Sequence, residues 1–375
     1  MSQFLPQSGH EGKYNSPHVR SRPALPDQLR GLDLIDSPIA IAHLVSPEHD
    51  LPDHPENPGR FAGFEAILQG LPDGTLRRIT PEPASEASLH RVHPPAYLAA
   101  LGQAAARGPA IVDYAPTYVT PSSYEDALLA AGAVAEVAAE VWDRRASAGF
   151  ALIRPPGHHA TAKRAMGFCL LNNIAIAARH VQSLGCERLM IVDVDVHHGN
   201  GTQEIFQADP SVLYLSTHQD GIYPGTGSLS ETGEGAGEGT VVNLPLPAYT
   251  GDEALSSAIE QIATPLARRF QPQMILVSAG FDTHWADPLA NLQSTCSGAF
   301  RLVRQLADLA DDICGGRLCL SLEGGYDPTA LAGCLQASLH ALAGIDPPPD
   351  PLGPSPYQQA DVGRVLASAR SVHGL

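Results

Sequence analysis

Residues 189–199 read Leu189-Met190-Ile191-Val192-Asp193-Val194-Asp195-Val196-His197-His198-Gly199 and join a short apolar run to acidic and histidine side chains. Apolar runs of this length are typical of buried parallel strands. Because alternate side chains of an extended chain share a face, Asp193, Asp195 and His197 point the same way. A catalytic zinc takes three protein ligands of these types and keeps a fourth position open. The stretch therefore predicts a metal site whose third ligand comes from elsewhere.

Four other apolar runs end in polar residues in the same way. They lead into Arg154-Pro155-Pro156-Gly157-His158-His159, Ser216-Thr217-His218, Ser278-Ala279-Gly280-Phe281-Asp282 and Glu323-Gly324-Gly325-Tyr326. Taken singly, any of these residues could cap a strand or begin a turn. In an open α/β sheet, however, ligands bind beyond the carboxyl ends of the strands. We therefore expect the polar residues after these five strands to form one site.

The motifs, in this order and spacing, resemble those of the zinc-dependent histone deacetylase family, with its bacterial relatives and acetylpolyamine amidohydrolases. They are HPE-x-P-x-R from His54, RPPGHH from Arg154, GFC from Gly167, DVDVHHGN from Asp193, SAGFD from Ser278 and EGGY from Glu323. The resemblance covers roughly residues 38–345. It implies an arginase/deacetylase-like α/β fold, with a central parallel sheet of about eight strands layered by helices. The implied activity is hydrolysis of acyl groups from lysine side chains or related amines.

The resemblance assigns one zinc ion per chain to Asp195, His197 and Asp282. One histidine with two carboxylates is oxygen-rich enough to accept iron(II) or another divalent ion as well. The related manganese ureohydrolases need a second set of ligands, typically in D-x-H-x-D. This chain has D-x-D-x-H-H from Asp193, which favours a single metal.

The adjacent histidines have different implied roles. By resemblance, His159 is the general base and also the acid that protonates the leaving amine, while His158 is an electrostatic partner. Asp193 is expected to orient His158, and Asn200 lies behind His159. An amide in place of a carboxylate should leave His159 less basic.

The resemblance also implies an oxyanion donor and a substrate channel. Tyr326 follows two glycines that let the backbone turn sharply, and its phenol would stabilise the charge that develops on the carbonyl oxygen. Gly167 and Phe168 form one wall of the expected tunnel, and Tyr223 forms the other. Leu289 takes a gate position that is Glu in members selective for acetylpolyamines. Asp113 is a candidate rim residue that grips the substrate backbone.

A potassium ion is expected close to the zinc. By resemblance its site comprises Asp193, the backbones of Asp195 and His197, and Ser216. The hydroxyl of Ser216 could equally satisfy the end of a strand.

Composition limits the function further. The net charge of −17 disfavours a nucleic-acid binder and suits cationic partners such as Lys-rich peptides or polyamines. The six cysteines form no C-x-x-C pair and are predicted to be buried free thiols. No apolar run approaches a membrane span and no signal-peptide core is present, which predicts a cytoplasmic protein without membrane contact. A homo-oligomer is left open.

The motifs must meet in space, which predicts one catalytic domain over residues 38–345. A polar extension is expected at residues 1–37. Residues 346–375 are predicted to form a Pro-rich linker and a C-terminal helix over 357–372, packed on or near the same domain. Ser122 and Glu125 have the capping-box spacing that marks a helix start.

Two other functions stay open. The substrate could be an acetylpolyamine or another small amide. Alternatively, the chain could be a catalytically silent acetyl-lysine binding module, although such a module would not need His158, His159 and Tyr326 together.

Overall fold

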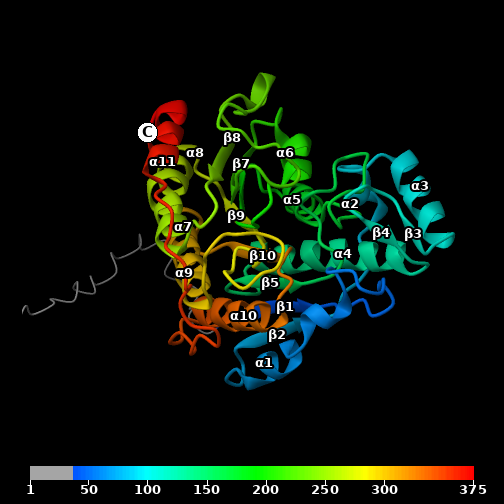
Figure 1. Ribbon diagram of the computed structural model, residues 1–375. Coiled ribbons are helices and arrows are strands. Elements are labelled where there is room, and N and C mark those ends of the chain that lie inside the picture. The colour runs from blue at the N-terminus through cyan, green and yellow to red at the C-terminus, as the bar shows by residue number, and fades with distance from the viewer. Residues whose placement is uncertain (1–36) are drawn as a thin grey trace, which may run out of the picture. The chain divides into compact units, whose positions relative to one another are not determined.

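The computed structural model describes residues 37–375, so the predicted extension at 1–37 lies almost entirely outside the described residues. Its main feature is an eight-stranded sheet in the order β2-β1-β5-β10-β9-β6-β7-β8 (Figure 1). All of its pairings are parallel. The strands are β1 (Ile39–His43), β2 (Leu76–Ile79), β5 (Gly149–Leu152), β6 (Leu189–Asp193), β7 (Val212–Gln219), β8 (Val241–Leu246), β9 (Met274–Ala279) and β10 (Leu318–Leu322). The predicted sheet, including its five motif-bearing strands, is confirmed.

The remaining elements connect and cover these strands. The α-helices are α1 (Phe64–Gly70), α2 (Glu86–His90), α3 (Pro95–Ala106), α4 (Ser123–Trp142), α5 (Asn173–Ser183), α6 (Asn200–Phe206), α7 (Asp252–Ala258), α8 (Thr264–Phe270), α9 (Cys296–Cys314), α10 (Pro328–Ala343) and α11 (Gly363–His373). Short helices are η3 (Pro58–Phe61), η4 (Gly235–Gly237) and the π-helical η5 (Ile259–Ala263). A separate hairpin pairs β3 (Ala110–Ile111) with β4 (Tyr118–Val119).

Helices cover both faces of the sheet because its strands are apolar on both faces. In β9, Ile275 and Val277 belong to one core cluster, which also contains side chains of α9 and α10. Met274 and Leu276 belong to a second cluster with side chains of α4 and α5. The alternation follows from the two-residue period of a strand. The sheet is therefore the middle of three layers.

One predicted helix cap and one predicted helix start differ in the structure. Helix α4 does begin after Ser122, but the Ser122 side chain makes no capping hydrogen bond and its hydroxyl instead contacts that of Thr120 at 3.2 Å. Helix α11 begins at Gly363 rather than at residue 357. The preceding segment is held in another conformation, because the Ala360 N–H donates to the carbonyl of Tyr249 at 2.9 Å.

None of the helices in residues 37–375 combines the length and the apolar character needed to cross a membrane.

Candidate active site

Three predicted metal ligands meet at the carboxyl edge of the sheet. Ligand atoms of Asp195, His197 and Asp282 all lie within 4.8 Å of one another. The Nδ1 atom of His197 lies 3.1 Å from Oδ1 of Asp195 and 3.2 Å from Oδ2 of Asp282. Strands β6 and β9 are paired neighbours, so the loops that follow them bring these side chains together.

The immediate surroundings fit a divalent cation. Oδ1 of Asp282 accepts the Val196 N–H at 2.9 Å, whereas its buried Oδ2 has no hydrogen-bond partner among the described residues. Such an orphaned carboxylate oxygen is costly unless a cation binds it. Two glycines make room for the carboxylates: a Cβ on Gly280 would lie 2.1 Å from Oδ2 of Asp195, and one on Gly324 would lie 2.1 Å from Oδ2 of Asp282. One imidazole and two carboxylates are also ligands that zinc accepts.

The charges of the three side chains are strongly coupled. Burial and the charge of Asp195 raise the pKa of Asp282. Burial acts in the same direction on Asp195, but His158 and His197 outweigh it and hold the pKa of Asp195 below its usual range. Two buried carboxylates this close together favour a cation between them.

The two neighbouring histidines have different partners. Nδ1 of His158 contacts Oδ2 of Asp193 at 3.1 Å, and Nδ1 of His159 contacts Oδ1 of Asn200 at 2.8 Å. Burial lowers the pKa of His158, but Asp193 and Asp195 outweigh it and raise the pKa to about 10. Burial lowers the pKa of His159 well below its usual value, and the nearby His158 adds to this. The surroundings therefore favour the charged form of His158 and the neutral form of His159.

Tyr326 is held in place by residues from two other segments. Its N–H donates to Oδ2 of Asp287 at 2.7 Å, and the guanidinium of Arg60 lies over its ring, 4.7 Å from the centroid. The Arg60 side chain also donates to the carbonyls of Gly325 and Glu323, each at 2.7 Å. The phenol position therefore depends on residues more than 200 positions away in sequence.

Glu323 has a positioning role that the sequence did not reveal. Its Oε2 accepts the N–H groups of Gly157 and His158 at 2.7 and 3.1 Å, and its Oε1 accepts the Ser278 hydroxyl at 3.1 Å. Burial raises the pKa of Glu323 to about 7. A single carboxylate at the end of β10 thus ties down the loop that carries both histidines. The available signal was a charged residue directly after an apolar strand.

The expected channel walls surround the catalytic groups. The Tyr223 ring lies edge-on to His159 with centroids 5.1 Å apart, and the Phe168 ring lies edge-on to Tyr326 at 5.9 Å. Gly167 permits close approach, because a Cβ there would lie 2.3 Å from Cδ2 of His159 and its φ is +56°. The Tyr223 hydroxyl is buried with no hydrogen-bond partner among the described residues.

The candidate rim residues lie in two loops. Leu289 is 38% exposed and its N–H donates to Oδ1 of Asp287 at 3.0 Å. Asp113 is buried and pairs with Arg164 at 2.8 Å. Its carboxylate is therefore already engaged by a side chain of the protein.

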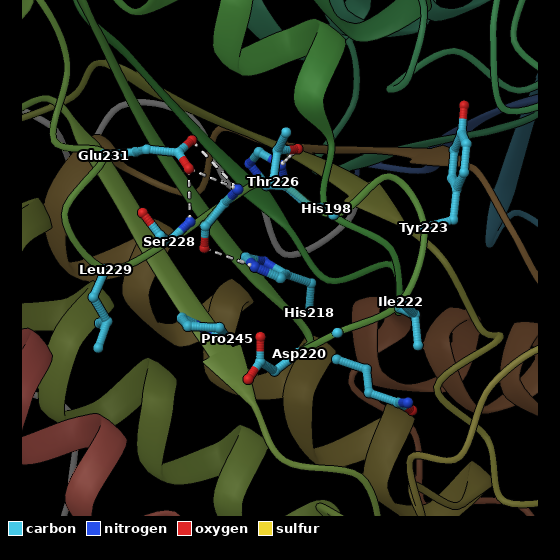
Figure 2. A pocket seen from close by; sticks show the side chains of 14 residues that line it. His198, His218, Asp220, Ile222, Tyr223, Thr226, Ser228, Leu229, Glu231 and Pro245 are labelled. Atoms are coloured by element: carbon cyan, nitrogen blue, oxygen red, sulfur yellow. Dashed lines mark hydrogen bonds between the residues drawn. The ribbon is translucent and has the colours of Figure 1, made fainter.

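A cavity of about 200 Å³ lies beside Tyr223 and is lined by the loop that follows β7 (Figure 2). Two histidines fix this loop against the sheet. Nδ1 of His198 contacts the Thr226 hydroxyl at 2.7 Å, and Nε2 of His218 contacts the Gly227 carbonyl at 3.0 Å. None of the three candidate metal ligands lines this cavity, and we assign it a supporting role for the tunnel wall.

The residues expected to bind potassium lie next to each other. Ser216 on β7 is in register with Asp193 on β6, and its hydroxyl contacts Nδ1 of His218 at 2.9 Å. The strand end that the sequence predicted at Ser216 is wrong, because β7 continues to Gln219.

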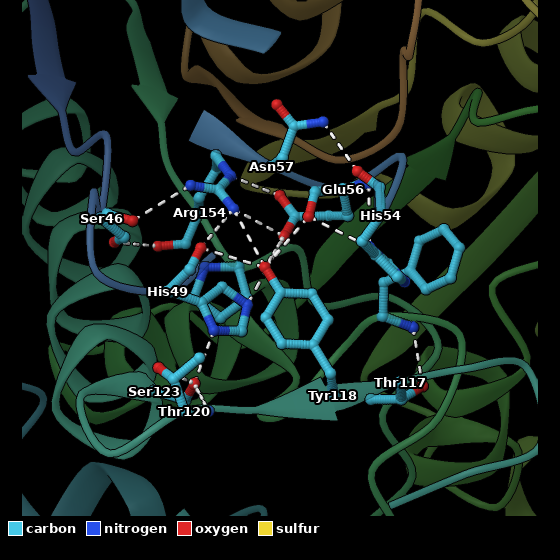
Figure 3. Close-up of polar contacts among 12 residues, drawn as sticks. Ser46, His49, His54, Glu56, Asn57, Thr117, Tyr118, Thr120, Ser123 and Arg154 are labelled. Carbon is cyan, nitrogen blue, oxygen red and sulfur yellow. Dashed lines mark hydrogen bonds and ion pairs between the residues drawn. The ribbon is translucent and has the colours of Figure 1, made fainter. Parts of the chain in front are cut away.

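A buried ionic network connects Glu56 with Arg154, the first residue of the RPPGHH segment (Figure 3). Glu56 is fully buried between two arginines, accepting from Nη2 of Arg154 at 2.8 Å and from Nη1 of Arg60 at 3.0 Å. The Tyr118 hydroxyl contacts the Glu56 backbone carbonyl at 3.0 Å. Burial raises the pKa of Glu56, but Arg154 outweighs it and holds the pKa well below its usual value. The HPE-x-P-x-R segment, which contains Glu56, is thus joined to the RPPGHH segment by a buried ion pair.

We expect Glu56→Gln to destabilise the fold by about 3–5 kcal/mol, because it leaves two buried guanidinium groups without a carboxylate. The measurement is urea unfolding at pH 7. The folded-state pKa of Glu56 lies below its ordinary value of about 4.5. Its ionised carboxylate therefore stabilises the fold fully above about pH 4.5, and this stabilisation is lost as the pH falls further. The difference between the variant and the parent should therefore shrink in acid.

The matched control is Glu65→Gln, which breaks the exposed ion pair with Arg78. Exposed pairs contribute about 0–1 kcal/mol, so this variant should unfold close to the parent. A Glu56→Gln protein as stable as the Glu65→Gln protein would contradict the role given to the network.

Comparison with known proteins agrees with this geometry. The family model described as "Histone deacetylase domain" matches residues 54–342. "Histone deacetylase 14, chloroplastic" from Arabidopsis thaliana is 52% identical over 237 residues, which cover 62% of this chain and 56% of the relative. The "Histone deacetylase-like amidohydrolase" of Pseudomonas aeruginosa is 38% identical over 303 residues, covering 78% of this chain and 77% of the relative. The solved "Crystal Structure of HDA15 HD domain" has a TM-score of 0.79 and 34% identity, and covers 90% of this chain and 95% of that chain.

The chain belongs to the histone deacetylase family. Its fold is the arginase/deacetylase-like fold that the sequence predicted, and its domain is that of a deacetylase amidohydrolase. The matched region is little more than half of the Arabidopsis relative's length.

Proposed function

We propose that this protein hydrolyses acyl groups from acylated lysine side chains with one zinc ion held by Asp195, His197 and Asp282. The observation that carries the proposal is the convergence of these ligands with the His158–Asp193 pair, the His159–Asn200 pair and the walls Tyr223 and Phe168, the latter against Tyr326. When bound, the metal would polarise the amide carbonyl and make water a better nucleophile.

In this proposal His159 moves the protons, whereas His158 stays protonated. The Asn200 Oδ1 atom accepts from Nδ1 of His159, so Nε2 of His159 carries the lone pair and takes the proton from water. The same nitrogen then returns this proton to the leaving amine. His158 keeps its own proton because Asp193 faces it, and its positive charge favours the negative charge that develops at the carbonyl oxygen.

Tyr326 would donate its O–H to that oxygen, and Phe168 and Tyr223 would enclose the substrate stem. Two facing rings bind a four-carbon chain by apolar contact. The proposed substrates are therefore acetylated lysine peptides or acetylated amines. Binding to nucleic acid or to a membrane is not part of the proposal. We also propose a potassium site at Asp193, Asp195, His197 and Ser216. A cytoplasmic location and a homo-oligomer are further parts of the proposal.

The proposed catalytic unit spans residues 38–345, and contacts between α11 and β8 support the proposal that the helix of segment 346–375 packs on it. The test of the proposed function is a parallel assay of the zinc-loaded protein. Its substrates are acetyl-lysine peptides, longer acyl-lysine peptides and N-acetylated spermidine and putrescine. Turnover of none of these would favour the silent binding module.

Leu289 is the observation that favours lysine over polyamine, because an apolar gate residue offers nothing to a second ammonium group. We expect a higher kcat/KM for acetyl-lysine peptides than for acetylpolyamines. Leu289→Glu should shift the ratio toward the polyamine by about 10-fold, the effect of a charge-assisted contact of roughly 1.5 kcal/mol. Leu289→Gln is the uncharged control and should leave the ratio near that of the parent.

A preference of the parent protein for acetylpolyamines would overturn the lysine assignment. It would place selectivity in the other loops around the tunnel.

A further inference from the structure

A second cluster of potential ligand side chains lies outside the catalytic site. His284 follows β9, Cys296 is the first residue of α9, and Cys334 lies within α10. One ligand atom from each lies within 4.8 Å of the other two. The two sulfur atoms are 3.6 Å apart, with the Cys334 thiol donating to Cys296. No step of the proposed hydrolysis uses this cluster.

The packing of the two helices creates this contact. A Cβ added to Gly333 would lie 2.7 Å from Sγ of Cys296, so glycine at this position lets the start of α9 approach α10. Both cysteines are only 1% exposed. Thr295 caps the helix, its hydroxyl accepting the Gly298 N–H at 3.0 Å. The Ser297 N–H of the same turn donates to Oδ2 of Asp350 at 3.1 Å, and the charge of this carboxylate opposes a negative charge on Cys296.

The two thiols differ in acidity. The hydrogen bond from Cys334 lowers the pKa of Cys296 to about 7, burial opposes this, and His284 adds to it. The same hydrogen bond and burial raise the pKa of Cys334 well above its usual value. One sulfur is therefore a nucleophile near neutral pH, and the other is a protonated thiol in contact with it.

We propose that Cys296 and Cys334 form a reversible oxidation site at which a peroxide converts the two thiols into a disulfide. The Cys296 thiolate attacks one oxygen of hydrogen peroxide, the O–O bond breaks, and a sulfenic acid and hydroxide form. The hydroxide takes the Cys334 proton. The Cys334 sulfur then attacks Sγ of Cys296, and the S–O bond breaks. The departing hydroxide becomes water with the proton that Cys296 released on ionising, and two electrons have passed to the peroxide oxygens.

The burial of the two sulfur atoms limits which oxidant can reach them. Hydrogen peroxide is close to water in size, whereas a glutathione disulfide is too large to reach sulfurs that are 1% exposed. Forming a bond of about 2.05 Å requires the sulfurs to approach by roughly 1.5 Å, a shift that side-chain rotation and a small helix movement can supply.

A thiophilic metal ion fits the cluster less well. Nδ1 of His284 accepts the Ala286 N–H at 3.1 Å, which places the ring proton on Nε2. That atom is buried with no hydrogen-bond partner among residues 37–375, and as an N–H it can favour a thiolate but cannot bind a metal.

The test uses the full-length protein, treated with hydrogen peroxide under native conditions and then alkylated. Once the treated protein is unfolded, non-reducing peptide mapping should show a Cys296–Cys334 cross-link, two of the six thiols should no longer react with the alkylating agent, and dithiothreitol should restore both. This readout is thiol chemistry, so it is independent of the proposed deacetylase function.

Cys314→Ser is the matched control, since it removes another buried cysteine of α9 and should keep the cross-link. Cys334→Ser should lose the cross-link and let a sulfenic-acid probe label Cys296 once the oxidised protein is unfolded. Three results would overturn the proposal: oxidation spread over all cysteines, over-oxidation of Cys296 without a cross-link, or thiols that react only after a chelator removes a metal.

Discussion

Asp282→Ala should remove the bound metal and abolish hydrolysis together. Asp282 supplies one of the two carboxylates among the three candidate metal ligands, and its Oδ2 has no hydrogen-bond partner among the described residues. Loss of an outer-shell partner already costs about 10–100-fold in metal affinity, so we expect more than about 100-fold for a direct ligand. The measurement is metal content per chain after dialysis, together with kcat/KM for an acetyl-lysine peptide.

Asp220→Ala is the control, because this exposed carboxylate lies at the end of β7 and lines the cavity rather than the metal site. It should keep both the metal and the activity. If Asp282→Ala kept its full metal content, Asp282 would not be a ligand and the site as described would be wrong.

Tyr326→Phe should reduce kcat by about 10²-fold or more, while substrate binding and metal content change little. The phenol would donate its hydrogen bond fully only as the carbonyl oxygen gains charge, so its loss affects the transition state more than the ground state. Removing a single oxyanion donor costs about 10²–10³-fold in other enzymes. Steady-state kinetics with an acetyl-lysine peptide measure kcat and KM, and metal analysis measures the metal content per chain.

Tyr249→Phe removes an exposed phenol and should leave kcat unchanged. Near-normal turnover by Tyr326→Phe would mean that this ring only shapes the turn after β10. The oxyanion would then depend on His158 and the metal alone.

Much of the fold was predictable because its buried strands are recognisable from their own local sequence. Continuous apolar runs such as Leu189–Val192 identify buried strands, and polar residues directly after them lie at one edge of a parallel sheet. This local pattern identified Asp195, His197 and Asp282 as candidates that the structure brings together.

The supporting residues could not be predicted in the same way. Glu56 meets Arg154 across 98 residues of sequence, and Arg60 reaches Gly325 across 265. No periodicity or spacing links positions so far apart, and the partner of a buried charge is defined only by the tertiary fold. The helix start at Gly363 was missed for a related reason, since a backbone hydrogen bond to Tyr249 overrides the local preference.

The position of β10 determines when the site can exist during synthesis. This strand, close to the end of the chain, pairs with β5 on one side and β9 on the other. Until residues 318–322 have left the ribosome, the strand before the two histidines and the strand before Asp282 have nothing between them. The site is therefore assembled last, when β10 is inserted into the middle of the sheet. Nascent chains and fragments that end before β10 should therefore fail to hydrolyse substrate, because they lack Tyr326 and the strand that joins the histidine loop to the metal ligands.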